Sequence, residues 1–285
     1  MLTIFTPTYN REKLLERAYQ SLLAQTNREF VWLIVDDGSV DGTKTLVEQW
    51  QNENQIVIKY IFQENGGKMR AHNTGVRNCE TELFFCLDSD DYLVKTAVED
   101  VLHCFSENRS TNIAGIVAHK GESDDKVLFN QVFPDIKKST LRVLYRSGFS
   151  GETSLIYKTE ILKKYLFPEI LGEKYVPEDY IYDKIDEDYK LIILPKILTI
   201  CELVEEGYTN QAAKLRRDNP TGWYLYYEQR ARLESFSILK IKYISHYICF
   251  AKFLKKNIYK ETTLNPVIVM LGIPGAIILA IAGKM

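Results

Sequence analysis

The first half of the chain predicts an α/β fold, in which a mostly parallel sheet carries helices on both faces. Strand-like and helix-like segments alternate from the start of the chain, as in β-α-β units. The run Phe30–Val35 is apolar throughout, which is typical of a strand covered on both faces. Polar motifs follow several of the apolar runs, and sheets of this kind bind ligands at the carboxyl ends of their strands. These observations together predict one ligand-binding crevice.

The predicted elements of this half follow one another in a regular order. Leu2–Thr6 is a short apolar run that predicts a strand, and leucines at helical spacing predict a helix over Arg11–Gln25. Asp41 occupies an N-cap position before a helix over Thr43–Gln51. The next three elements are predicted to be a strand, a helix and a strand, over Ile56–Phe62, Lys68–Asn78 and Leu83–Leu87.

The second half has a less regular pattern. Two strands and one helix are expected between residues 112 and 203, over Ile113–Ala118, Ile192–Leu194 and Glu178–Ile185. Turn-forming residues at 218–222 mark a soft boundary. A long helical stretch, in one or two pieces, is expected after this boundary, over Thr221–Tyr259.

The composition is that of an ordinary globular protein. The 285 residues are 46% hydrophobic and 26% charged, and the net charge of −2 gives no sign of nucleic-acid binding. The five cysteines are scattered without CxxC spacing, so neither a zinc site nor a disulfide framework is expected. Reduced thiols in the cytosol are the simpler interpretation. No basic segment followed by an apolar one opens the chain, so no signal peptide is expected.

The C-terminal part predicts contact with a membrane. Residues 266–283 carry no charge and approach the length that crosses a bilayer, although Pro274 and glycines interrupt them. The preceding stretch, Lys240–Lys260, interleaves lysines with aromatic residues and contains no acid. The alternative is a solvated lysine face followed by a buried core helix. Whether the tail spans the membrane, enters it or packs on protein stays open.

The motif Asp88-Ser89-Asp90-Asp91 follows the predicted strand Leu83–Leu87. Three carboxylates within four residues repel one another, so such a cluster usually needs a cation. Hard oxygen ligands favour Mg²⁺ or Mn²⁺, and magnesium is typically shared with the phosphates of a substrate. The motif therefore predicts a metal-assisted site for a substrate that carries a diphosphate. The alternative is an acidic turn that caps a helix at Val94.

Two further motifs are candidates for nucleotide contacts. In Asp36-Asp37-Gly38-Ser39, a carboxylate at a strand end can accept hydrogen bonds from a base or ribose, although Asp-Gly is also a common turn. In Asn65–Gly75, paired glycines before a helix let backbone N–H groups approach an anion, and Lys68 and Arg70 add positive charge. A glycine loop with solvated basic residues is an equally good interpretation of the second motif.

The last motif, Pro177-Glu178-Asp179-Tyr180, opens a predicted helix. An acidic pair at a helix N-terminus is stabilised by the helix dipole, which is a sufficient structural explanation. The functional alternative is that one carboxylate acts as general base on an acceptor hydroxyl.

In order and spacing, these motifs resemble the family 2 glycosyltransferases, an inverting family with a GT-A fold. The resemblance covers about the first 190 residues. The matching segments are Thr6–Arg11, Ser21–Thr26, Val35–Thr43, Glu64–Gly75, Leu87–Asp91 and Pro177–Asp179. Each segment is weak evidence alone, whereas the ordered set is specific.

The resemblance implies a role for each matching position. Asp179 would be the general base, paired with Glu178. Asp90 would bind Mn²⁺ or Mg²⁺, with Asp88 and Asp91 as further ligands or neighbours. The nucleotide-sugar would contact a set of residues from the earlier motifs, namely Pro7, Tyr9, Asn10, Arg11, Asp37, Gly67, Lys68, Asn73, Asp88 and Ser89. Pro7, Tyr9 and Asp37 would line the pocket for the base and ribose.

Some features depart from the family pattern or extend it. His72 stands where many relatives have an arginine, which puts in doubt any nucleotide contact made by that arginine. The Gln-x-x-Arg-Trp motif of processive synthases is absent, which favours transfer of a single sugar. Arg216 and Arg217 are expected either to hold the diphosphate or to form a solvated basic pair.

The resemblance thus implies an inverting, metal-dependent glycosyltransferase that moves one sugar from a nucleotide-sugar, with UDP the expected nucleotide. The acceptor would be a saccharide, or a lipid-linked saccharide at the cytoplasmic face of a bacterial membrane, in cell-surface polysaccharide biosynthesis. Residues 1–218 would form the GT-A catalytic domain, with a nucleotide-sugar half at 1–110 and an acceptor half at 111–218. Residues 219–285 would form the membrane-associating tail.

Two other functions are weighed against this one. A non-catalytic membrane module that binds nucleotide-sugar or glycan would be expected to have damaged motifs, but both acidic motifs look intact. A nucleotidyltransferase usually has a glycine-rich first loop, but Thr6–Asn10 contains no glycine. The sequence gives no readable signal about the sugar, the acceptor, the linkage or the oligomeric state. Donor selectivity is expected between Lys120 and Glu152, where Gly148–Thr153 either borders the acceptor or is a plain loop.

Overall fold

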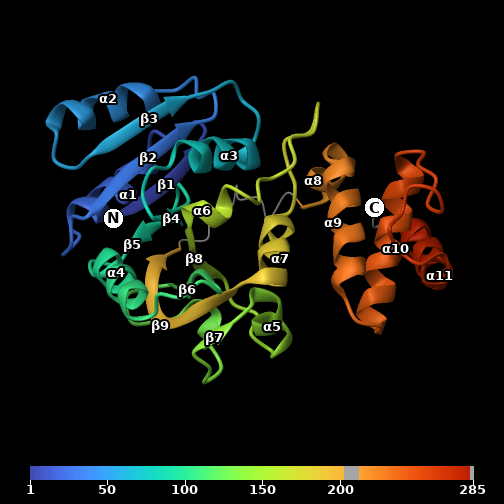
Figure 1. Cartoon of the computed structure of the whole chain (residues 1–285). Helices are drawn as coiled ribbons and strands as arrows, with labels where there is room; N and C mark the ends of the chain where they lie inside the picture. Colours follow the sequence, from blue (N-terminus) through green and yellow to red (C-terminus); the bar gives the residue numbers. More distant parts are fainter. Residues whose placement is uncertain (202–211, 283–285) are drawn as a thin grey trace. The chain divides into compact units, whose positions relative to one another are not determined.

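The computed structural model describes residues 1–201 and 212–282 of the chain (Figure 1). Two compact units are present: Met1–Leu166 with Ile181–Val204, and Phe167–Tyr180 with Glu205–Met285. The first unit holds the sheet, and the second holds the C-terminal helices. Leu203 and Gly283, which end two of the stretches expected from the sequence, lie outside the described residues. The functional division expected at residue 218 stays a prediction.

One half of the sheet is parallel, as predicted. Its strands lie in the order β3-β2-β1-β4 and are β1 (Leu2–Thr8), β2 (Phe30–Asp36), β3 (Ile58–Phe62) and β4 (Leu83–Cys86). The connecting helices are α1 (Leu15–Leu23), α2 (Thr43–Glu53) and α3 (Lys68–Asn78). All seven residues of β1 are buried, since helices cover both faces of a parallel sheet.

One predicted helix start and one predicted N-cap are wrong, whereas α2 begins at Thr43 as expected. Helix α1 begins at Leu15 rather than Arg11, because the backbone N–H groups of Asn10 and Arg11 bind Ser39 Oγ and Thr43 Oγ1 at 2.8 and 3.2 Å. These hydrogen bonds hold the chain in a loop before the helix starts. The N-cap of α2 is Gly42 rather than Asp41, although an Asp41 oxygen still accepts a hydrogen bond from the first helical residue at 3.0 Å.

The other half of the sheet is mixed, so the expectation of a mostly parallel sheet is wrong. Its longer strands are β6 (Ile113–Gly121), β8 (Thr153–Lys158) and β9 (Lys190–Ile200). β8 lies antiparallel between β4 and β6, and β9 is parallel to β6. The short strands β5 (Tyr92–Leu93) and β7 (Lys138–Ser139) pair antiparallel with β9.

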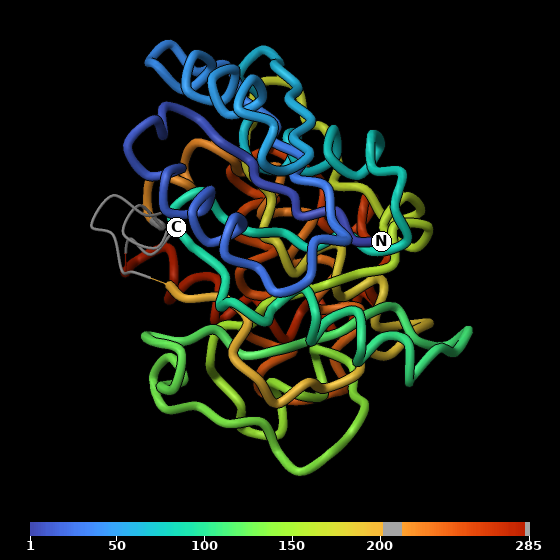
Figure 2. Tube along the Cα trace, turned by 90° about the vertical axis from the view of Figure 1, so that its left-hand side faces the viewer, coloured from blue at the N-terminus to red at the C-terminus, as the bar shows by residue number. Residues whose placement is uncertain are grey.

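The connection between β6 and β8 explains this change of direction. A parallel pair needs a crossover, usually a helix that spans the sheet. This connection contains a 3₁₀ turn (Leu128–Asn130), β7 and the short helix α5 (Leu141–Arg146), and none of these is long enough for such a crossover. In Figure 2 the blue chain of α2 lies at the upper end of the view, and the green chain that connects β6 to β8 lies at the lower end.

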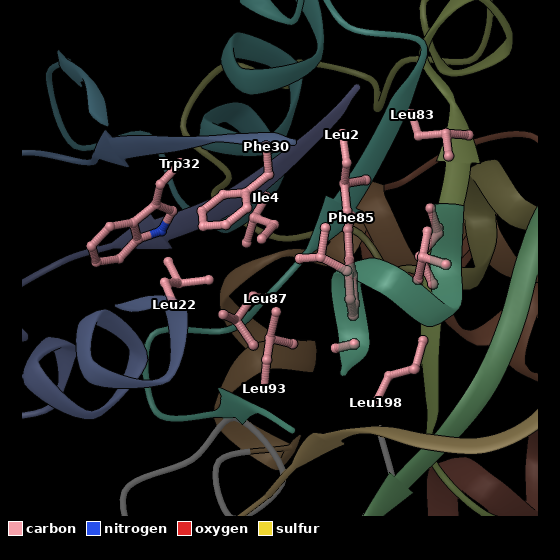
Figure 3. Packing of buried hydrophobic residues seen from close by; sticks show 14 of the residues in the cluster. Leu2, Ile4, Leu22, Phe30, Trp32, Leu83, Phe85, Leu87, Leu93 and Leu198 are labelled. Atoms are coloured by element: carbon pink, nitrogen blue, oxygen red, sulfur yellow. The ribbon is translucent and has the colours of Figure 1, made fainter. Parts of the chain in front are cut away.

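The core of the first unit packs α1, α2 and α4 (Ala97–Glu107) against one face of the sheet. Figure 3 shows side chains of β1, β2 and β4 with Leu22 of α1 and with Leu93 and Leu198. Tyr19 and Trp50 stack with ring centroids 4.3 Å apart, and Trp32 lies 5.7 Å from Trp50. Each such aromatic pair contributes about 1 kcal/mol beyond the burial of its surface. The unit also contains α6 (Thr159–Leu162) and most of α7 (Asp179–Asp188).

The second unit is helical, and its long predicted stretch is confirmed as two pieces. Its helices are α8 (Ala212–Asp218), α9 (Pro220–Leu233), α10 (Ile238–Phe253) and α11 (Pro266–Ile281). Tyr224 of α9 packs on Tyr247 of α10, with ring centroids 5.0 Å apart. Ser245 Oγ of α10 donates to the Gly272 carbonyl of α11 at 3.0 Å. The three longest helices therefore share one core.

Helix α11 is only partly buried in this core. Val269, Gly272 and Ala276 are buried, whereas a larger set of apolar side chains is exposed, namely Val267, Met270, Leu271, Ile277, Ile278 and Ile281. The helix has 16 residues. Among the described helices, none is both long enough and apolar enough to span a membrane.

Candidate active site

Three of the predicted motifs meet at one edge of the sheet in the first unit. Thr8 and Asp36, which end β1 and β2, are direct partners in the sheet. The Asp37 N–H donates to the Thr8 carbonyl at 2.8 Å, and the Leu87 N–H donates to the Phe5 carbonyl at 2.8 Å. The residues that follow β1, β2 and β4 therefore lie next to one another, because the three strands are parallel and adjacent.

The first motif is tied to the second by Asn10. Asn10 has a left-handed backbone (φ 53°), which asparagine tolerates better than most residues, and its Oδ1 accepts the Val40 N–H at 2.9 Å. Pro7 is buried in β1, whereas Tyr9 is 48% exposed and Arg11 is partly buried. The ring of Tyr9 is thus accessible to a ligand at this edge. The nucleotide contacts of these residues stay predictions.

Asp37 is buried, and its carboxylate holds the glycine loop. Its Oδ1 accepts from Gln63 Nε2 at 2.6 Å and from the Gly66 N–H at 2.9 Å, while its Oδ2 accepts from the Gly67 N–H at 2.7 Å. Both oxygens are therefore engaged by the protein. The neighbouring Asp36 accepts a hydrogen bond from the Tyr60 hydroxyl at 2.7 Å. The pKa of Tyr60 is raised mainly by burial and secondly by this hydrogen bond. A contact between Asp37 and a nucleotide base stays a prediction. Such a base would have to share the carboxylate oxygens with the glycine loop.

The helix after the glycine loop contributes one lysine and a neutral histidine. Lys68 Nζ lies 2.7 Å from Asp88 Oδ1. His72 packs edge-on against Phe5 and Phe84, and burial lowers its pKa to about 3. At neutral pH His72 therefore has no charge to offer a phosphate. Asn73 is fully buried beside it, so its nucleotide contact also stays a prediction.

Asp88 is held between two lysines. Lys68 lies at 2.7 Å from one carboxylate oxygen, and Lys120 Nζ lies at 3.8 Å from the other. Burial acts to raise the pKa of Asp88, but the two ammonium groups outweigh it and lower this pKa to about 2. Asp88 is therefore ionised at neutral pH. Ser89, which follows it, is buried.

Asp91 is a buried anchor for Lys120. Lys120 Nζ lies 2.9 Å from Asp91 Oδ2, and Cys201 Sγ donates to the same oxygen at 3.1 Å. Burial raises the pKa of Asp91, although Lys120 opposes this effect. Burial also acts on Lys120, but Asp91 and Asp88 raise the pKa of its ammonium well above the usual value. Lys120 also lies 3.8 Å from Glu152, so it joins the acidic motif to the start of β8.

Asp90 differs from its two neighbours. Its backbone carbonyl accepts from Arg17 Nη2 at 3.0 Å, and its side chain is half-buried. Its carboxylate makes no side-chain hydrogen bond or ion pair within the described part of the chain. One free carboxylate next to the Lys68–Asp88 pair suits a cation that shares its remaining ligands with phosphates and water.

The residues present therefore fit Mg²⁺ or Mn²⁺ only in such a shared site. Across residues 1–201 and 212–282, no three Asp, Glu, His or Cys side chains are grouped as a metal cage. Asp90 would be the metal ligand, whereas Asp88 and Asp91 are engaged by lysines. A donor diphosphate would supply the missing oxygens.

Glu178 and Asp179 belong to the other compact unit, where Asp179 opens α7. Asp179 is 53% exposed, and Arg230 Nη2 of α9 donates to its Oδ2 at 2.6 Å. Arg216 lies over the ring of Trp223 at 5.4 Å, and Arg217 pairs with Asp218. A contact of either arginine with a diphosphate stays a prediction.

Two functional candidates have little signal in the sequence. Lys120 and Cys201 end or follow strands far apart in the sequence, and only the parallel pairing of β6 with β9 brings both to Asp91. The one available signal for Lys120 was its position near the end of a buried strand, where a lysine needs a partner.

A cavity of about 840 Å³ lies at the opposite end of β4 from Asp88. It is lined by Cys79 and Thr81 before β4, and by Lys158 and Lys163. Both lysines donate to backbone carbonyls, of Ser110 at 2.8 Å and of Cys79 at 2.9 Å. The cavity contains none of the predicted motifs, so it is not the candidate site.

Comparison with known proteins agrees with the arrangement of these motifs. The family model described as glycosyl transferase family 2 matches residues 3–166. An uncharacterised glycosyltransferase of Nostoc (alr2836) is 29% identical over 175 residues, which are 59% of this chain and 53% of that protein. The poly(ribitol-phosphate) β-N-acetylglucosaminyltransferase TarS of Staphylococcus aureus is 28% identical over 176 residues, which are 59% of this chain and 30% of TarS. The chain thus spans about half or less of the length of these relatives.

Solved structures show the same fold. S. aureus TarS 1–349 in complex with UDP-GlcNAc superposes with a TM-score of 0.63 and 21% identity, over 98% of this chain and 81% of that chain. The mannosyltransferase PcManGT of Pyrobaculum calidifontis, in complex with GDP-Man and Mn²⁺, superposes with a TM-score of 0.57 and 18% identity, over 98% of this chain and 80% of that chain. With the family model covering more than half of the residues, we conclude that the chain belongs to glycosyltransferase family 2.

Proposed function

We propose that the chain is an inverting, metal-dependent glycosyltransferase that moves one sugar from a nucleotide-sugar to a saccharide acceptor. The observation that carries the proposal is the free carboxylate of Asp90 beside the Lys68–Asp88 ion pair of 2.7 Å. This edge offers one metal ligand and one positive charge, which is what a diphosphate leaving group needs. The position at the ends of parallel strands is where folds of this kind bind ligands.

The donor is proposed to be a UDP-sugar. Support comes from TarS, which has been solved with UDP-GlcNAc. The exposed ring of Tyr9 and the glycine loop held by Asp37 would line the nucleotide pocket. Lys68 Nζ, already at the acidic motif, would contact the diphosphate.

The reaction is proposed to be a single displacement at the anomeric carbon. Asp179 takes the proton of the acceptor hydroxyl, the acceptor oxygen forms the new bond to the anomeric carbon, and the bond to the nucleoside diphosphate breaks. One displacement inverts the configuration. A bound Mg²⁺ or Mn²⁺ would neutralise the charge of the leaving diphosphate. Asp90 would hold that ion, and Lys68 and Lys120 would keep Asp88 oriented.

The acceptor is proposed to be a lipid-linked saccharide at the cytoplasmic face of a membrane. A relative from Campylobacter jejuni, 26% identical over 170 residues, is named GalNAc(5)-diNAcBac-PP-undecaprenol β-1,3-glucosyltransferase. The exposed apolar side chains of α11 and the lysines of the preceding stretch would contact the membrane surface. This attachment would raise the local concentration of a lipid-linked acceptor.

Donor turnover tests the proposal. The full chain is incubated with UDP-, GDP- and dTDP-sugars, with Mn²⁺, Mg²⁺ or EDTA, and with a membrane lipid extract as the acceptor source. We expect release of nucleoside diphosphate from one donor, which EDTA and Asp90→Ala both abolish. Asp188→Ala is the matched control, because Asp188 is an exposed aspartate of the same unit outside the predicted motifs and should leave turnover unchanged. Tight nucleotide binding without turnover would instead favour a non-catalytic binding module.

A further inference from the structure

The segment Phe167–Tyr180, which ends with the proposed base, is built against helix α9 of the same unit. The Glu173 carboxylate accepts the N–H groups of Thr221 and Gly222, both at 2.8 Å. These are N–H groups of the first turn of α9, which have no partner within the helix. Glu173 thus caps α9 and fixes the middle of the segment to it.

The contact is reciprocal and close. Asn219, the N-cap residue of α9, accepts the N–H groups of Lys174 and Tyr175 at 2.7 and 2.9 Å. A Cβ atom at Gly222 would lie 2.4 Å from the Tyr175 carbonyl, so the two backbones could not approach this closely with any other residue at this position. The segment and the start of α9 therefore form one packed piece.

Farther along α9, two neighbouring side chains hold the end of the segment. Gln229 Nε2 donates to the Tyr180 carbonyl at 2.8 Å, and Arg230 Nη2 donates to Asp179 Oδ2 at 2.6 Å. The Arg230 side chain is 15% exposed, and its guanidinium lies over the Tyr226 ring at 5.3 Å. Its position is therefore fixed by packing as well as by charge.

The two oxygens of Asp179 are in different situations. Oδ2 accepts from Arg230, whereas Oδ1 accepts no hydrogen bond from the residues that the structure describes. A carboxylate that is 53% exposed would rotate freely if nothing held it. Engaging one oxygen fixes the plane of the group and leaves the other oxygen available for a proton.

We propose that Arg230 is a positioning residue, which holds Asp179 by one oxygen so that the other oxygen faces the acceptor hydroxyl. The inference rests on the proposed function, in which Asp179 is the general base. It extends that function by making α9 part of the catalytic machinery and not only part of a membrane-associating tail. A base must be held within a fraction of an ångström, and a displacement of about 1 Å can lower the rate about 100-fold.

The test compares two substitutions on neighbouring residues of α9. Arg230→Ala removes the contact with the carboxylate, and Gln229→Ala removes the contact with the next backbone carbonyl. We expect Arg230→Ala to lower kcat for transfer by about 30- to 100-fold with the donor KM within about twofold. Arg230→Lys should keep an intermediate rate, because it retains the charge but not the planar geometry. Gln229→Ala should lower kcat by less than about fivefold.

Chemical rescue separates positioning from folding. Guanidinium at millimolar concentration should restore part of the kcat of Arg230→Ala, and it should not change Gln229→Ala. Asp179→Asn should reduce transfer to a small residual rate, and adding Arg230→Ala to it should lower that residual rate no further. Thermal melting of each variant shows whether it is folded.

The outcomes distinguish the two proposals. If the wild-type chain does not turn over any donor, the proposed function falls and the role of Arg230 falls with it. If the wild type is active but Arg230→Ala keeps its kcat, only the positioning role is overturned. A folded Arg230→Ala variant whose lost rate guanidinium does not restore, and whose effect adds to that of Asp179→Asn, would also overturn it.

Discussion

Removing Lys120 should destabilise the first unit, because it would leave a buried carboxylate without its counter-charge. The Lys120 side chain is 14% exposed and that of Asp91 is 7% exposed, with 2.9 Å between Nζ and Oδ2. Breaking a buried pair by removing one partner usually costs about 3–5 kcal/mol. Cys201 also donates to Asp91, so a value near the lower end, about 3 kcal/mol, is expected for Lys120→Met.

The loss of unfolding free energy should depend on pH, because Asp91 can become neutral by binding a proton. Burial and the nearby Asp88 already raise the pKa of Asp91, and Lys120 opposes them. Without Lys120 the folded-state pKa rises further above the unfolded value of 3.8. A group whose pKa is raised on folding destabilises the folded state as pH rises through that pKa. Lys120→Met should therefore be less damaging at pH 5 than at pH 8.

Urea unfolding in EDTA, followed by tryptophan fluorescence, measures the loss. Trp32 and Trp50 report on this unit because they stack in its core. Asp91→Asn in the Lys120→Met background should recover more than half of the lost free energy, since it removes the unpaired charge. Lys126→Met is the control, because its pair with Glu122 is exposed and should contribute little to stability.

Two results would refute this reasoning. One is a loss of less than about 1 kcal/mol for Lys120→Met at pH 8, which would mean that the pair is solvated. The other is a double variant that is no more stable than the single one, because the cost would then come from lost packing of the lysine stem and not from charge.

The remaining predictions concern the same unit. Burial lowers the pKa of His72 to about 3 from 6.5, so the stability that neutral His72 contributes is complete above pH 6.5 and is lost as pH falls toward 3. The variant His72→Leu should therefore reduce the change in unfolding free energy between pH 7.5 and 5.5 by about 1.4 kcal/mol, measured by urea unfolding. An unchanged pH dependence would contradict this. Gly38 has φ +88°, and a Cβ there would lie 2.9 Å from the Asn65 backbone nitrogen, so Gly38→Ala should lower the free energy of unfolding by about 2–3 kcal/mol. The control is Gly148→Ala, which should lower it by about 1 kcal/mol, because φ is +101° but the surrounding space is open. Equal losses for the two glycine variants would show that the clash at Asn65 is relieved by movement of the loop.

The parallel half of the sheet could be predicted because its signals are local. A run such as Phe30–Val35 is apolar at every position, which is typical of a strand buried on both faces. Helices of 9 to 11 residues connect the runs, so the direction of each strand follows from the length of its connection. The predicted and observed strand ends therefore agree within two residues for Ile56–Phe62 and its neighbours.

The mixed half could not be predicted in the same way. β8 lies between β4 and β6 through pairings such as Phe84 with Tyr157 and Val117 with Leu155, which join positions far apart in the sequence. No local pattern specifies which strand becomes the neighbour of which. The direction of β8 depends on a connection whose longest helix has only six residues, and such a connection gives no periodic signal.

The position of the candidate site was predictable, but the ion pairs and hydrogen bonds within it were not. The ends of adjacent parallel strands determine where Asp37 and Asp88 lie, and this follows from strand order alone. Which charges pair does not follow from strand order, because Lys120 reaches Asp91 only through the register of β6 against its neighbours. Likewise the segment before α7 shows an acidic pair, but nothing in it indicates an arginine 51 residues later.

The acidic motif shows how adjacent identical residues acquire different roles. Asp88, Asp90 and Asp91 have the same chemistry, and their environments differ only in what lies opposite each carboxylate. Asp91 points to a buried lysine and a thiol, and Asp88 lies between two lysines. Asp90 faces neither, although Arg17 fixes its backbone. The two lysines therefore neutralise two of the three negative charges before any ligand binds. This neutralisation lets three carboxylates lie together at one strand end without mutual repulsion, and it leaves Asp90 as the carboxylate best able to accept a cation together with a donor diphosphate.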